Sequence, residues 1–86
     1  MKIPRLKKGD AIEIEWIDAH FRSDPGWCDE EEFIDAEPVV IKSVCQYVSR
    51  DRDYINTVSD RSGTDPVGVM RDLRIPKGCI VSLRKL

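Results

Sequence analysis

The chain has 86 residues, of which 41% are hydrophobic and 35% are charged, and its formal net charge is −2. A chain of this length makes one small domain, and no stretch has the unbroken apolar length of a transmembrane helix or the pattern of a secretory signal peptide. We therefore expect a single domain over residues 1–86 in the cytoplasm, with no membrane contact.

The charges are unevenly distributed along the chain. Residues 10–37 carry eleven acidic side chains against one arginine, whereas residues 71–86 carry five basic ones against Asp72. If the two segments lie on opposite sides of the domain, this asymmetry gives the surface an acidic face and a basic face. Alternatively, the charged side chains are simply solvated on the outside of a small domain. An acidic half that faced the same side as a nucleic-acid site would repel phosphate.

The three cysteines are Cys28, Cys45 and Cys79, an odd number at wide spacing. This spacing favours reduced thiols over a disulfide framework or a CxxC metal site. Cys45 and Cys79 lie in apolar runs and are expected to pack as small hydrophobic residues. Because a domain of this size has a marginal core, we expect self-association to stabilise it.

The clearest strand covers residues 11–16, where Ile12, Ile14 and Trp16 alternate with glutamates. Such strict alternation is typical of a strand with one buried face.

Residues 18–38 follow as a long connection that is rich in carboxylates. An acidic first turn predicts a short helix from about Glu30 to Ala36. Phe33 and Ile34 are expected to pin this helix to the rest of the domain, and Trp27 to cover one end of it. The consecutive acids do not converge as oxygen ligands, so we expect neither a metal ion nor a cofactor.

The second half of the chain predicts four more strands. We expect a bent strand over residues 39–49 that changes its buried face, and further strands at 54–58, 67–75 and 80–83. The connections between them are a charged turn at 50–53, a polar loop at 59–66 and a tight corner at 76–78. The fold class is therefore mainly β, a five-stranded, strongly bent small barrel of the SH3-like or Sm-like order, with a short helix in the long first connection.

Two short segments resemble the motifs of the Sm-like family. Tyr54-Ile55-Asn56 matches the last three positions of the family's Asp-x-x-Met-Asn turn, although Arg52 stands where the motif has aspartate. The run from Ile75 to Ile80 has the isoleucine spacing of the family's Ile-Arg-Gly-x-x-Ile corner, with Pro76-Lys77 in place of Arg-Gly. The resemblance covers about residues 39–86, and within the family this segment looks more particularly like the small divergent members encoded by phages.

The resemblance implies assembly into a homo-oligomeric ring, in which the fourth strand of one copy pairs with the fifth strand of its neighbour. The interface residues would be Val69, Ile80, Val81 and Leu83. Independently, Ile80 and Val81 are apolar at adjacent positions, as if both faces of the last strand were covered, and an unpaired edge of that kind favours aggregation.

The resemblance also implies a site for single-stranded RNA. Tyr54 would stack on a base, Asn56 would hydrogen-bond it, and Arg50, Arg52 and Lys77 would supply positive charge. The alternative for these residues is structural, because Tyr54 would then pack across strands and residues 50–53 would form a solvated turn.

Two other functions remain open. An SH3-like protein-interaction module would use Phe21 and Trp27, set among carboxylates, to bind a basic or proline-rich segment. An oligomeric scaffold of phage or mobile-element origin would bind only itself. We do not expect an enzyme, because the single histidine, His20, has no neighbouring nucleophile and no paired titratable groups are recognisable.

Overall fold

The computed structural model describes residues 2–18, 27, 29–35 and 37–86. Its elements in chain order are β1 (Ala11–Asp18), α1 (Glu30–Asp35), β2 (Val39–Arg50), β3 (Tyr54–Val58), β4 (Asp60–Arg61), β5 (Val69–Met70), β6 (Leu73–Pro76), the 3-10 turn η1 (Lys77–Cys79) and β7 (Ile80–Lys85). The chain is mainly β, as the sequence predicts.

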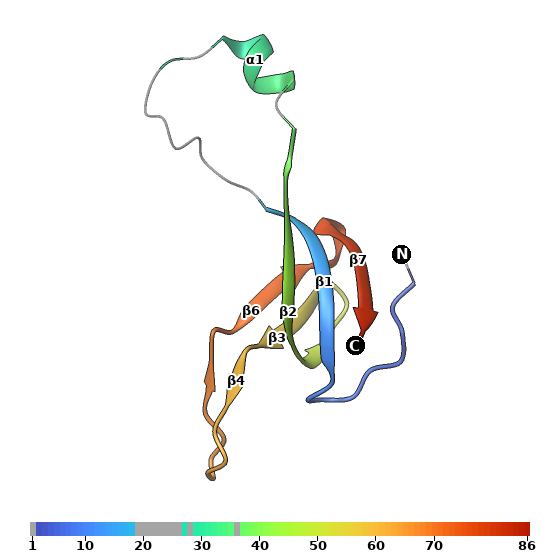
Figure 1. Cartoon of the computed structure of the whole chain (residues 1–86), viewed down its shortest axis with the longest axis vertical. Helices are drawn as coiled ribbons and strands as arrows, with labels where there is room; N and C mark the ends of the chain where they lie inside the picture. Colours follow the sequence, from blue (N-terminus) through green and yellow to red (C-terminus); the bar gives the residue numbers. More distant parts are fainter. Residues whose placement is uncertain (1, 19–26, 28, 36) are drawn as a thin grey trace.

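Five strands form one antiparallel sheet in the order β6-β3-β2-β1-β7 (Figure 1). The long strand β2 belongs to two halves of the sheet. Val39 to Gln46 pair with β1 in one half, and Gln46 to Arg50 pair with β3 in the other. The register shifts between Tyr47 and Ser49, and such an irregularity bends a strand. This irregularity agrees with the predicted bend. The predicted change of buried face is wrong as far as Tyr47, because the less exposed side chains keep the same alternation from Val39 to Tyr47 and Val44 is 64% exposed.

The core draws on every strand of the sheet. It consists of Ile12 and Ile14 from β1, Tyr47 from β2, Ile55 from β3, Ile75 from β6 and Leu83 from β7. Because side chains from both terminal strands meet in one cluster, the sheet curls around it, and Ile3 and Leu6 of the N-terminal segment pack against the same cluster.

The sheet curls without closing. Within the described part of the chain, β6 pairs only with β3 and β7 pairs only with β1, so the closed barrel expected from the sequence is not found. The reason lies in the connection between these two strands. The single turn η1 carries the chain from one half of the sheet to the other without pairing β6 to β7.

The segment from residue 59 to residue 75 differs from the prediction of a polar loop followed by one strand. Asp60–Arg61 pairs with Val69–Met70 as a separate two-stranded sheet. Arg71 then adopts a φ of 53°, which ends β5 before β6 begins. A non-glycine residue with positive φ breaks the extended backbone that a continuous strand requires.

The expected helix in the first connection is present as α1, but it does not cover the sheet. Ile34 is 66% exposed and Trp27 is fully exposed, so the predicted pinning by Ile34 and the predicted cover by Trp27 are both wrong. The side chain of Phe33 lies outside the described residues. Since β1 and β2 remain paired as far as Asp18 and Val39, the connection leaves from the end of this hairpin, and α1 lies beyond the sheet (Figure 1).

Of the three cysteines, Cys28 lies outside the described residues. Cys45 and Cys79 are free and partly buried, and both pack against the core as small hydrophobic residues. In the part of the chain that the structure covers, no helix has the length and apolar character needed to cross a bilayer.

Candidate nucleic-acid interface

The turn between β2 and β3 is organised by the carboxylate of Asp51. Its Oδ1 accepts hydrogen bonds from the backbone N–H groups of Asp53 and Tyr54, each at 2.9 Å. An aspartate that bonds the backbone two residues on is a standard turn-forming device. These two bonds, followed by the positive charge of Arg74, hold the pKa of Asp51 below its usual value. The turn therefore carries a stable negative charge.

Tyr54 and Asn56 lie on one face of β3. They are half-buried and alternate with Ile55 and Thr57, which are buried on the other face. Side chains two residues apart on a strand project to the same side. The structure thus brings together the aromatic ring and the amide that the sequence pairs in one motif.

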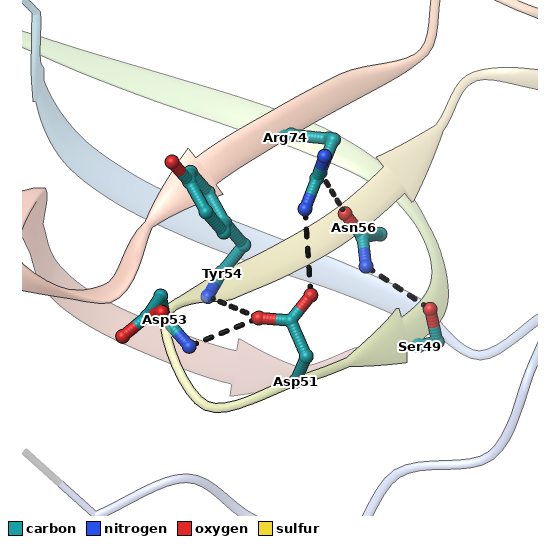
Figure 2. A network of polar contacts seen from close by, with 6 residues as sticks. All are labelled: Ser49, Asp51, Asp53, Tyr54, Asn56 and Arg74. Atoms are coloured by element: carbon teal, nitrogen blue, oxygen red, sulfur yellow. Dashed lines mark hydrogen bonds and ion pairs between the residues drawn. The ribbon is translucent and has the colours of Figure 1, made fainter.

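Arg74 completes this face and is a residue that the sequence motifs did not predict. It is the register partner of Asn56 on β6. Its Nε donates to Oδ1 of Asn56 at 2.9 Å, its Nη2 lies 3.4 Å from Oδ2 of Asp51, and its Cζ lies 4.4 Å from the centre of the Tyr54 ring (Figure 2). In the sequence, Arg74 is a polar residue between the apolar Leu73 and Ile75, and this alternation is the signal that could have placed it on the outer face of the strand.

The amide of Asn56 has a defined orientation. Its Nδ2 donates to Oγ of Ser49 at 3.1 Å, while its oxygen accepts from Arg74 (Figure 2). An amide has two N–H donors and two acceptor lone pairs. One donor and one acceptor therefore remain for a further partner.

The predicted cations lie at different places around the turn. The backbone N–H of Lys77 donates to the carbonyl of Asp53 at 2.8 Å, so the corner at η1 lies against the turn, and Lys77 contributes to the lowered pKa of Asp51. Arg52 is exposed within the turn. Arg50 is the register partner of the buried Ile55, which places it on the face opposite to Tyr54.

The four predicted interface residues also differ in their environment. Val69 and Val81 are 49% and 50% exposed. Ile80 is partly buried against the core, and Leu83, at 8% exposure, belongs to the core itself. Of these four residues, Val69 and Val81 are the two that are well exposed to solvent in a single copy of the chain.

A cysteine thiol and the possible metal ligands were the other reactive groups to consider in the described residues. Burial raises the pKa of the Cys45 thiol, which lies beside a recess of about 410 Å³ between β2, β3 and β6. A thiol with a raised pKa is a poor nucleophile. Across the described ranges, no three histidine, cysteine or acidic side chains are placed to hold a metal ion.

Comparison with known proteins identifies no relative: no family model, curated protein or solved structure matches this chain.

Proposed function

We propose that this chain is an Sm-like domain that binds single-stranded RNA through the face formed by Tyr54, Asn56, Arg74 and Lys77. The observation that carries the proposal is the placement of an aromatic ring, an oriented amide and cationic side chains at one turn. Single-stranded nucleic acids are bound by this combination, because bases stack on rings and cations neutralise phosphates. Arg50 lies on the other face and is not part of the proposed site.

The acidic charge of α1 does not conflict with this site. The exposed acids Glu30, Glu31 and Glu32 belong to α1, near the Val39 end of β2, whereas the Asp51 turn follows its Arg50 end (Figure 1). Twelve residues of strand separate the two ends, about 35 Å along an extended chain. This distance exceeds the screening length of about 8 Å at physiological salt. The acids of α1 are therefore largely screened from the proposed site.

We propose further that β6 of one copy pairs with β7 of the next to build a homo-oligomeric ring. Within the described residues both strands have one unpaired edge, and η1 holds these strands at the two ends of the sheet. Val81 is exposed on β7, and an apolar strand with an open edge favours pairing with another chain. This arrangement supports the Sm-like form of the small barrel, in which neighbours complete the sheet.

Fluorescence anisotropy with U-rich and A-rich oligoribonucleotides tests the RNA site. We expect binding that weakens with salt and that Tyr54→Ala reduces by about 5- to 150-fold, since a stacked base is worth about 1–3 kcal/mol. Tyr54→Phe is the matched control, because it keeps the ring and should retain binding. Absence of binding at tens of micromolar protein would refute the RNA proposal.

Light scattering tests the ring separately. We expect a mass that is a multiple of 9.9 kDa, and we expect Val81→Lys to lower it, because a charge at an edge strand opposes pairing. A monomer at every concentration would refute the ring and leave the RNA site to be judged by the anisotropy alone.

A protein-interaction module is the second candidate, favoured by the full exposure of Trp27 close to the acidic turn of α1. A large exposed aromatic side chain among carboxylates suits a basic or proline-rich segment. In a Trp16→Phe variant Trp27 is the only tryptophan, so its emission should shift to the blue on addition of a lysine- and leucine-rich or a proline-rich peptide. An unchanged spectrum with both peptides would refute this candidate. An oligomer that binds neither RNA nor peptide would leave the scaffold role.

A further inference from the structure

The guanidinium of Arg74 covers one face of the Tyr54 ring. Its Cζ lies 4.4 Å from the centre of the ring (Figure 2). A base and a guanidinium cannot lie on the same face of one ring at the same time. Arg74 must therefore move before that face of Tyr54 can take a base.

The contacts that hold Arg74 over the ring are exposed ones. Its Nη2 and the Oδ2 of Asp51 are 3.4 Å apart, and both side chains are at least half exposed. Exposed ion pairs and exposed cation–π contacts each contribute little, because water and salt screen them. The guanidinium is thus held in place by contacts that a stronger anion can replace.

A phosphate group is such an anion. The planar fork of a guanidinium bonds two phosphate oxygens at once, and this pairing is stronger than a single contact with a carboxylate at 3.4 Å. Of the cations near the turn, Arg74 alone is fixed by three contacts, to Tyr54, Asn56 and Asp51, around the ring that would receive the base. Because Arg74 lies beside the ring that would receive the base, its guanidinium would lie close to the phosphate of the same nucleotide.

We propose that Arg74 is the phosphate-binding residue of this site and that Asp51 holds it over Tyr54 until single-stranded RNA replaces the contact. The base then takes the face of Tyr54, and the guanidinium moves from the Asp51 carboxylate to the phosphate. This inference rests on the proposed function. It also implies that Asp51 weakens RNA binding, because the negative charge of Asp51 competes with the RNA for Arg74.

Two substitutions test the roles of Asp51 and Arg74 separately. Asp51→Asn removes the charge and keeps a side-chain oxygen that can accept the hydrogen bonds from Asp53 and Tyr54, so the turn is preserved. Arg74→Gln removes the cation. Arg84→Gln is the matched control, because Arg84 is also an exposed arginine in an ion pair, with Glu13, and the substitution changes the net charge equally.

The experiment is anisotropy with oligouridine over a series of salt concentrations. We expect Asp51→Asn to bind roughly two- to five-fold more tightly, which corresponds to the loss of one exposed ion pair. We expect Arg74→Gln to reduce the slope of log K against log salt by about 0.7, the value for one phosphate contact on a single strand, and Arg84→Gln to leave the slope unchanged.

The outcomes distinguish this inference from the function on which it rests. If the unmodified protein does not bind RNA, both are refuted. If it binds RNA but Arg74→Gln has the original slope, or binds more tightly at every salt concentration, Arg74 only obstructs the ring and this inference alone is refuted. Weaker or equal binding by Asp51→Asn would also refute the competition between Asp51 and RNA.

Discussion

Asp51 makes the stability of the turn dependent on pH. Its carboxylate accepts hydrogen bonds from Asp53 and Tyr54 and lies beside Arg74, so its pKa is lower in the folded chain than in the unfolded chain. A group of this kind stabilises the fold above its unfolded pKa, about 3.9, and this contribution is lost as the pH falls through the lower folded pKa.

We therefore expect the unfolding free energy to decrease below about pH 4, and to decrease less in Asp51→Asn, which has no charge to lose. Urea titrations at pH 7 and pH 3 give the comparison. Equal decreases in the two proteins would show that Asp51 does not contribute.

Ile55 is one of the fully buried residues of the core. It lies in β3, the strand that joins the edge strand β6 to the shared strand β2. Removal of its outer carbons leaves a cavity that neighbouring side chains fill only in part. Ile55→Ala should therefore cost about 2–5 kcal/mol, a large part of the stability of a small domain.

Chemical denaturation measures this loss. Val44→Ala is the control, because Val44 is exposed and its truncation should change the unfolding free energy by less than about 0.5 kcal/mol. A loss of similar size in both variants would contradict the position of Ile55 in the core.

At the scale of elements, we expect the connection between β1 and β2 to be separable from the sheet. Among the described residues, no member of the core belongs to this connection, and Asp18 and Val39 are register partners at the end of the hairpin. Two paired residues can be joined by a two-residue turn such as Asn-Gly.

Replacement of residues 19–38 by Asn-Gly should therefore leave the sheet folded. We expect a strand-type circular dichroism spectrum and a cooperative thermal transition with a midpoint close to that of the full chain. Loss of the transition would show that the connection stabilises the sheet through residues outside the described part.

The sequence predicts those elements whose pattern is local. The alternation around Ile12 and Ile14 identifies β1, and the mixed pattern of residues 39–49 predicts the bend in β2. Arg71 marked the place where the pattern of residues 67–75 fails, but a sequence does not show that its backbone turns to positive φ.

The candidate site was predictable only in part for a similar reason. Tyr54 and Asn56 are close in the chain, whereas Arg74 reaches them through the register of β3 with β6. Register depends on the whole sheet, so the sequence alone did not show that this arginine lies over the ring. The exposure of Trp27 was missed because the large apolar area of a tryptophan favours burial.

The whole molecule is more extended than its length requires. Its radius of gyration is 16.0 Å and its longest dimension is 52 Å, whereas a compact chain of this length has a radius of about 12 Å. Figure 1 shows the two parts that extend from the curled sheet, α1 at one end and the β4–β5 hairpin at the other. The candidate site and the core both lie in the compact part between them.

The pairing of β1 with β7 has a consequence for how fast the native state is reached. Glu13 and Arg84 meet across a separation of 71 positions, whereas β1, β2 and β3 pair with neighbours along the chain. Closing so long a segment loses entropy before any contact compensates for it. The adjacent hairpins should accordingly assemble first and β7 should dock last, so refolding followed by stopped-flow fluorescence should take milliseconds to seconds rather than microseconds.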